Sequence, residues 1–222
     1  LTMCATGCSS SESSHPERGT KTEFEQSPKF MSGNANPLLD FMYVADPTSV
    51  VYEGRVYVYG TNDHQQFEHV GKDGKNSYEH IHSLVMMSTN DMVNWTYHGT
   101  IDVASISPWG AASWAPSIVS RLEEDGKMHF YLYYSNSGGG VGVLTSTSPV
   151  GPWSDPLGRN IVDHSTPTLG NCSAPFDPGV VIDDQGTGWL AFGGGDKNKS
   201  GTDYMPGNAR IVRLGKDMIS LD

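Results

Sequence analysis

A short pattern recurs three times in this chain. It occupies residues 45–50, 114–119 and 176–181, and each copy has proline at its third position followed by apolar residues. Proline lacks a backbone N–H and fixes φ, so a sheet accepts it at the start of a strand and not in the middle of one. The pattern therefore predicts three strand starts.

Two of the three copies place an aspartate directly before the proline, Asp46 and Asp177. If the three strands converge, both carboxylates point into one shared space. Asp-Pro is also a common way to start a turn, so each aspartate taken alone is compatible with a purely structural role. Their matching positions in repeated units favour a functional pair.

Each copy opens a unit of about four short strands. The expected strands are residues 50–52, 55–60 and 84–88 in the first unit, 118–121, 128–134 and 141–146 in the second, and 180–182, 188–192 and 209–214 in the third. Turns containing glycine separate the first two strands of each unit, at residues 53–54, 124–126 and 183–186. The prolines are 69 and 62 residues apart. Four-stranded sheets repeated in this way indicate the blades of a β-propeller, whose first strands lie nearest the axis.

Composition supports an all-β fold and narrows the range of partners. The chain has 222 residues with 26 glycines, 13 prolines and 10 tyrosines, and β-branched and aromatic residues alternate in several runs. A net charge of −11 argues against nucleic acid and anionic lipid as partners and suits a neutral sugar better. The three cysteines, Cys4, Cys8 and Cys172, form neither a disulfide framework nor a zinc-site spacing. No apolar run is long enough to span a membrane.

Residues 1–35 differ in composition from the rest. Small residues end at Cys8 and a serine-rich tract follows, which resembles the end of a bacterial lipoprotein signal with Cys8 as the lipidated residue. A plain disordered leader is the alternative. We therefore expect a signal remnant and disordered tether in residues 1–35 and a partial propeller in residues 36–222. This interpretation predicts a secreted or cell-envelope lipoprotein of a bacterium, held at the membrane only by its lipid anchor.

Two other stretches suggest metal sites less strongly. His64, His69, His80 and His82 cluster in a polar insertion, and a strand over residues 80–82 would put two of these rings on one face. Because no acidic or thiol partner lies at fixed spacing, we favour a rim around the sugar pocket over a zinc site. Residues 183–186 are similar to a calcium loop but lack the other ligands of one, so we expect a hairpin turn there.

From about residue 36 to 222, the chain resembles glycoside hydrolase family 43, and within it the arabinoxylan arabinofuranohydrolases. The motifs that carry the resemblance lie in the family's order: Ala45-Asp46-Pro47, Asn94-Trp95, Ser113-Trp114-Ala115-Pro116, Tyr131-Leu132-Tyr133-Tyr134-Ser135, Ser148-Pro149-Val150-Gly151-Pro152-Trp153 and Phe176-Asp177-Pro178.

The resemblance implies a five-bladed β-propeller, of which about three blades fall in this chain. It also implies removal of α-L-arabinofuranosyl side groups from arabinoxylan with inversion. Asp46 matches the general base, and Asp177 matches the aspartate that tunes the pKa of the general acid. Trp114 and Phe176 match aromatic residues that contact substrate, although Trp114 is also compatible with packing between blades.

One departure from the family pattern concerns the general acid, a glutamate of the fourth blade. No glutamate follows Glu124 in this sequence. We therefore expect a partial sequence that does not turn over a glycoside by itself.

The expected partner is plant cell-wall polysaccharide, either arabinoxylan or arabinan. The chemistry requires no cofactor, and the resemblance suggests a structural calcium in the central channel. Two alternatives stay open: a β-xylosidase or endo-arabinanase on the same fold, and a propeller that binds polysaccharide without cleaving it.

Overall fold

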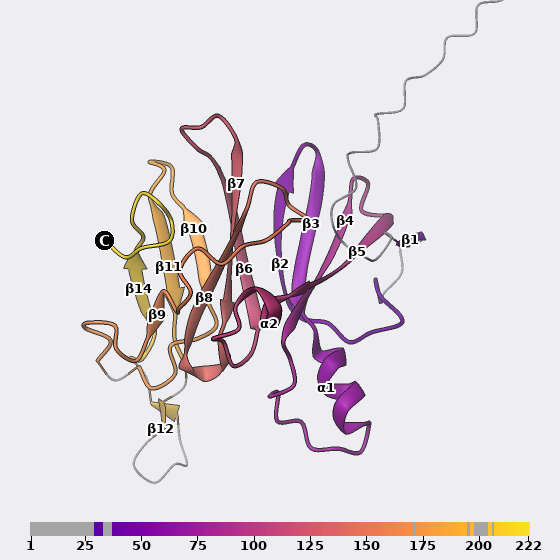
Figure 1. Ribbon diagram of the computed structural model, residues 1–222, viewed down its shortest axis with the longest axis horizontal. Helices are drawn as coiled ribbons and strands as arrows, with labels where there is room; N and C mark the ends of the chain where they lie inside the picture. The colour runs from indigo at the N-terminus through magenta and orange to yellow at the C-terminus, as the bar shows by residue number, and fades with distance from the viewer. Residues whose placement is uncertain (1–28, 33–36, 171, 195, 198–203, 206) are drawn as a thin grey trace, which may run out of the picture.

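The computed structural model of the chain confirms an all-β architecture, with three antiparallel sheets, a two-stranded ribbon and short helical segments (Figure 1). The structure describes residues 29–32, 37–170, 172–194, 196–197, 204–205 and 207–222. The proposed lipidation residue, Cys8, lies outside the described residues. Within them, no helix is both long and apolar enough to cross a membrane.

The first sheet has five strands in the order β1-β5-β4-β3-β2. Its strands are β1 (Lys29–Ser32), β2 (Ala45–Tyr52), β3 (Arg55–Thr61), β4 (Ser83–Thr89) and β5 (Asn94–Asp102). Glu53 and Gly54 both have positive φ, 48° and 74°, which confirms the predicted two-residue hairpin turn. Pairing of β1 with β5 means that the sheet includes residues before the expected domain start at 36.

The second sheet has four strands in the order β6-β7-β8-β9, and the third has three in the order β10-β11-β14. Their bounds are β6 (Trp114–Leu122), β7 (Met128–Ser135), β8 (Gly140–Ser146), β9 (Val162–Asp163), β10 (Gly179–Ile182), β11 (Gly188–Phe192) and β14 (Arg210–Arg213). β12 (Asp196–Lys197) and β13 (Tyr204–Met205) pair separately. The three predicted units are therefore present, but the described residues do not close into a ring, and the count of five blades stays a prediction.

The polar insertion that carries the clustered histidines contains a helix, α1 (Asp63–Val70), which was not predicted from the sequence. Gln66 is the buried residue of this helix, so the sequence carries little of the apolar periodicity that would have predicted it. Residues 80–82 lie in the loop before β4, so no strand places the rings of His80 and His82 on one face. The other helical segments are α2 (Val103–Ile106) and a 3₁₀ turn, η1 (Ser137–Gly139).

The three prolines mark strand starts, as predicted, but two of them lie inside a β-bulge. The pairing register of β2 shifts between Ala45 and Thr48, and that of β6 shifts between Trp114 and Ser117. A bulge leaves one residue outside the hydrogen-bond ladder, which is where a sheet can accept proline. In the third unit, β10 begins directly after Pro178.

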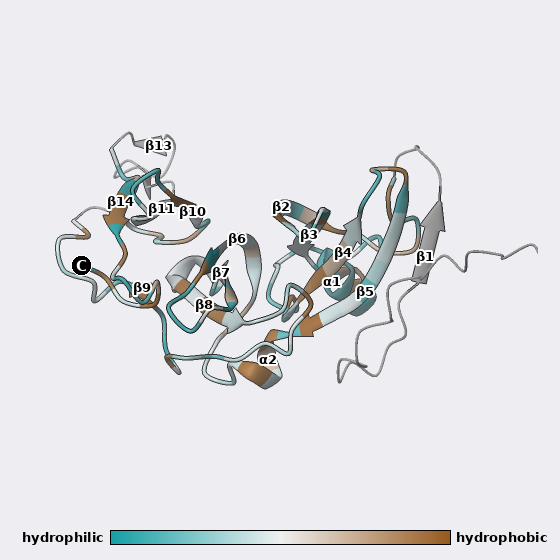
Figure 2. Cartoon of the chain, turned by 90° about the horizontal axis from the view of Figure 1, so that it is seen from above, coloured by the Kyte–Doolittle hydropathy of each residue, from teal (hydrophilic) through white to brown (hydrophobic). Residues whose placement is uncertain are grey.

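The sheets stand side by side, with β2 next to β6 and β6 next to β10 (Figure 2). The second sheet is buried on both faces. Leu132 on β7 packs into a core shared with the first sheet, and its neighbour Tyr133 packs into a core shared with the third. This alternation follows from the two-residue period of a strand. Cys172 is buried in the second of these cores.

Side-chain hydroxyls join the first strands of neighbouring sheets. The backbone N–H of Ile118 donates to Thr48 Oγ1 at 3.3 Å, and that of Val180 donates to Ser117 Oγ at 3.0 Å. Thr48 and Ser117 each follow the proline of their unit, so the same link occurs twice. At this position the third unit has Gly179, which has no hydroxyl.

Replacing Ser117 with Ala should destabilise the fold by about 1 kcal/mol, because it leaves the part-buried Val180 N–H without its partner. Chemical denaturation of the full-length protein measures the change. Ser120→Ala, on the same strand, removes a hydroxyl that does not join two sheets and should change stability by no more than about 0.5 kcal/mol. Equal losses from both variants would contradict the proposed importance of the link.

Candidate active site

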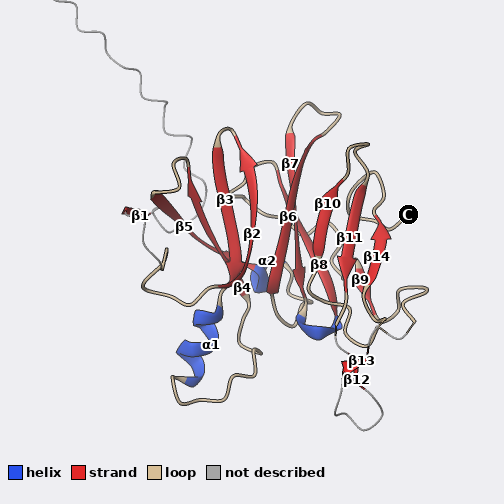
Figure 3. Cartoon of the chain, turned by 180° about the vertical axis from the view of Figure 1, so that it is seen from behind, coloured by secondary structure: helices blue, strands red, loops and turns tan. Residues whose placement is uncertain are grey.

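Asp46 lies in the bulge at the start of β2, beside the end of β3. Its backbone has a left-handed φ of 51°. The buried hydroxyl of Thr61, on β3, donates to Asp46 Oδ2 at 3.1 Å. This hydrogen bond orients the carboxylate at the end of the first sheet, where the chain passes from β3 into α1 (Figure 3).

Asp177 precedes β10 and also has a left-handed φ, 49°. Its partner is Ser135, a fully buried residue at the end of β7 in the second sheet. The Ser135 hydroxyl accepts a bond from the Asp177 N–H at 2.8 Å and lies 3.4 Å from Asp177 Oδ1, to which it donates. The second sheet therefore positions the acidic residue of the third.

The two aspartates interact electrostatically. Burial raises the pKa of Asp177, and the negative charge of Asp46 raises it further. Burial and the charge of Asp46 likewise raise the pKa of Asp63, the first residue of α1. Asp46 therefore lies close enough to both Asp63 and Asp177 for its charge to raise their pKa values, as expected if the strand starts converge. Asp46 and Asp177 are exposed residues at this open end, and their chemical roles stay predictions.

The backbone takes the same unusual turn in all three units. Ala115 has a φ of 22°, so each residue before the three prolines has positive φ. The residue before proline ordinarily prefers an extended conformation, and left-handed backbone is uncommon outside glycine. Such outliers cost about 1–3 kcal/mol and cluster at functional sites.

The predicted substrate-binding aromatic residues, Trp114 and Phe176, are both half-buried beside these turns. The Trp114 indole N–H donates to the carbonyl oxygen of Tyr78 at 2.9 Å. The Phe176 ring packs against Gly194, where a Cβ would lie 2.4 Å from the ring. Both rings are therefore held in place by the protein, and contact with a sugar stays a prediction for each.

Sequence reasoning missed three residues of the cluster. Thr61 and Ser135 bind the carboxylates, and Asp63 adds a third acidic group. Thr61 and Ser135 are the last residues of β3 and β7, and Asp63 begins α1, but their sequence positions do not reveal which side chains meet. The pairing of β2 with β3 brings Thr61 to Asp46, and the packing of the third sheet against the second brings Asp177 to Ser135.

Three histidines of the insertion have a close side-chain partner. The rings of His69 and His80 stack with centroids 3.4 Å apart, and His64 Nε2 lies 3.5 Å from Glu68 Oε1. Across the described residues, no three His, Cys, Asp or Glu side chains gather as a metal site would require. Residues 183–186 form the expected hairpin turn, in which Asp183 Oδ1 accepts the N–H groups of Gln185 and Thr187.

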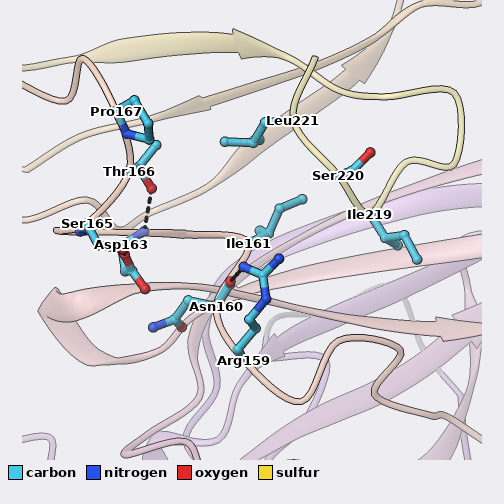
Figure 4. A pocket seen from close by; sticks show the side chains of 10 residues that line it. All are labelled: Arg159, Asn160, Ile161, Asp163, Ser165, Thr166, Pro167, Ile219, Ser220 and Leu221. Atoms are coloured by element: carbon cyan, nitrogen blue, oxygen red, sulfur yellow. Dashed lines mark hydrogen bonds between the residues drawn. The ribbon is translucent and has the colours of Figure 1, made fainter.

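A pocket of about 320 Å³ lies away from the aspartates, between the loop around β9 and the turn at residues 219–221 (Figure 4). Asp163, its acidic residue, is already hydrogen-bonded to the N–H and hydroxyl of Ser165. The pocket contains neither of the paired aspartates nor an aromatic ring, so it is a weaker candidate for glycoside chemistry.

Replacing Asp177 with Asn should raise the melting temperature at neutral pH. Because folding raises the pKa of this carboxyl, its ionised form is disfavoured in the folded state and lowers stability above that pKa. The penalty disappears as the pH falls through the raised pKa, so the two proteins should converge in acid. Thermal unfolding of the full-length protein across this range measures the effect.

Asp125 is the matched control, since a hydrogen bond with His129 lowers the pKa of its carboxyl. Its ionised form is favoured by folding, so Asp125→Asn should not raise the melting temperature at neutral pH. If Asp125→Asn raised the melting temperature as much as Asp177→Asn, the conclusion that ionised Asp177 destabilises the folded state would be contradicted.

The sequence and fold match a known family. Residues 35–222 match the model for glycosyl hydrolases family 43. The chain is 42% identical over 200 residues to an arabinoxylan arabinofuranohydrolase of Paenibacillus polymyxa and 44% identical over 202 residues to one of Bacillus subtilis (strain 168). Each match covers 85% of this chain but 31% and 39% of the relative, so the chain spans about a third of the length of these proteins.

A solved structure agrees with the sequence matches. The crystal structure of a family 43 arabinoxylan arabinofuranohydrolase from Bacillus subtilis, in complex with cellotetraose, matches with a TM-score of 0.76 and 39% identity. The match covers 86% of this chain and 41% of that one. The resemblance carried by the short motifs is thereby confirmed, and the chain belongs to glycoside hydrolase family 43.

Proposed function

We propose that the protein containing this chain removes α-L-arabinofuranosyl side groups from arabinoxylan with inversion of configuration. The observation that carries the proposal is the matched placement of Asp46 and Asp177, which come from separate sheets. Each lies in a left-handed turn before a proline, and each is hydrogen-bonded to a buried hydroxyl. The names of the relatives that cover most of this chain support the same substrate. Because the chain spans only part of them, the activity concerns the full-length protein.

In this mechanism Asp46 is the general base. Its carboxylate accepts a proton from water, and the water oxygen attacks the anomeric carbon opposite the leaving oxygen, which inverts the configuration. The hydroxyl of Thr61 supports this role, because it fixes the carboxylate while leaving an oxygen free for water. A carboxylic acid protonates the leaving oxygen. The family's glutamate has this role, and no glutamate follows Glu124 in this sequence.

Asp177 tunes the general acid. A negative charge beside a carboxylic acid raises the pKa of that acid, which keeps it protonated until the leaving oxygen needs the proton. The bonds from Ser135 support this role by holding Asp177 in one position. Trp114 and Phe176 contact the sugar through their rings, which suit its apolar faces.

The remaining features of the proposal concern the whole protein. The full fold is a five-bladed propeller, and the three sheets described here are its first blades. The described residues offer no group of acidic side chains that would hold calcium, so a calcium ion in the channel would need other ligands, and the mechanism uses none. Cys8 anchors the protein to the bacterial envelope through a lipid.

Replacing Asp46 with Asn should lower kcat/KM by about 10²–10⁴-fold, because the amide cannot accept the proton from water. Hydrolysis of an aryl α-L-arabinofuranoside by the full-length protein measures the loss. An aryl β-xyloside and linear arabinan, tested alongside, separate the proposed activity from β-xylosidase and endo-arabinanase activity.

Asp40→Asn, in the loop before β2, is the control and should retain activity. Full activity of the Asp46→Asn variant would remove Asp46 from the base role. A wild-type protein that binds arabinoxylan but cleaves none of the three substrates would favour the polysaccharide-binding alternative.

A further inference from the structure

The loop between α1 and β4, residues 71–82, is held by neighbouring glutamines of the helix. Gln66 Oε1 accepts a hydrogen bond from the backbone N–H of His80 at 3.1 Å, and Gln65 Oε1 accepts one from the N–H of His82 at 2.8 Å. Gln66 is buried, so its amide faces protein and not solvent. The helix therefore sets the position of a loop that has no strand partner of its own.

Two further hydrogen bonds fix this loop against the start of β6. The N–H of Ser113 donates to the carbonyl oxygen of Ile81 at 2.9 Å, and the indole N–H of Trp114 donates to that of Tyr78 at 2.9 Å. Ser113 and Ile81 are both buried. The loop thus joins the first and second sheets at the strand end that carries Asp46, and it fixes the ring of Trp114.

Tyr78 combines an unusual backbone conformation with an exposed aromatic side chain. Its φ is 62°, a left-handed value that bulky residues rarely adopt, and Asn76 Oδ1 accepts its N–H at 3.1 Å. Its side chain nevertheless remains 49% exposed. The centroid of its ring lies 6.1 Å from that of Trp114, and the two planes meet at 66°. The rings therefore form an open apolar corner.

We propose that Tyr78 and Trp114 together form a subsite for a backbone sugar of the polysaccharide, next to the sugar that is removed. The inference rests on the proposed function, because it needs Trp114 to border the pocket of the departing sugar. Trp114 is half-buried and directly precedes the strained turn of β6, whereas Tyr78, whose ring contacts it edge-on, is more exposed. A sugar ring that packs on Tyr78 therefore lies one position further out.

The proposed contact accounts for an exposed aromatic side chain at a residue with left-handed backbone. A flat ring offers a large apolar area with few rotatable bonds, so it binds a sugar face at low entropic cost. Burial of the ring by packing would not need the left-handed turn, and a polar residue would serve an exposed loop better. The chemistry of the corner suits a xylopyranose unit of arabinoxylan.

The test compares a small and a large substrate in the full-length protein. Tyr78→Asn removes the ring but keeps a residue that tolerates left-handed backbone. The variant should raise KM for an arabinoxylo-oligosaccharide by about tenfold, or ~1.4 kcal/mol. Its KM for an aryl α-L-arabinofuranoside, which has no backbone sugar, should rise much less. Tyr78→Phe should restore the wild-type ratio of the two KM values.

Leu122→Ala is the control for loss of an exposed apolar side chain, since Leu122 lies at the opposite end of β6 and is 63% exposed. An equal change in KM for both substrates, or none for either, would overturn the inference while leaving the proposed function intact. If the wild type cleaves neither substrate, the proposed function fails, and calorimetry with an unsubstituted xylo-oligosaccharide decides the subsite. Weaker binding by Tyr78→Asn then supports it, and equal binding rejects it.

Discussion

The left-handed turn before each proline is the constraint on which the rest of the site depends. In a regular strand, side chains alternate between the two faces of the sheet. Here the second sheet has a core on each face, so a charged side chain within its strands would be buried without water. The left-handed turn, accompanied by a bulge in the first and second sheets, places one residue outside this alternation at the strand start. Asp46 and Asp177 occupy that position, and aspartate tolerates left-handed backbone better than most residues.

Hydrogen bonds with four hydroxyl groups hold the two acidic residues and the strands that carry them in position. Thr48 and Ser117 join the first strands of adjacent sheets, while Thr61 and Ser135 hold the carboxylates. Movement of the third sheet relative to the second would break the bonds of both Ser117 and Ser135, whereas Thr61 and Asp46 belong to the same sheet. Hydroxyls suit this work because each can donate and accept without adding charge beside two anions.

The sequence predicted most strands and turns of the three sheets, although it missed β1 and β9, but it did not predict the side-chain contacts between the sheets. Glycine-containing turns and proline-marked starts predicted the hairpins, since those residues have few other conformations. Helix α1 was missed because its buried residue is Gln66, a polar side chain that leaves no apolar period. The hydroxyl partners were missed because Ser135 and Asp177 are 42 residues apart, and only the packing of the second sheet against the third brings them together.

The paired aspartates and the proposed sugar contact of Tyr78 are positioned by different interactions in this fold. The aspartates are positioned by first strands whose spacing follows from the apolar cores between the sheets. Tyr78 is positioned by amide and backbone hydrogen bonds of a loop outside those cores. If Tyr78 contacts the polymer as proposed, a change in the loop alters that contact without disturbing the carboxyl pair, whereas a change in the cores disturbs both. This separation is the physical reason that one scaffold can keep its reaction while its outer subsites vary.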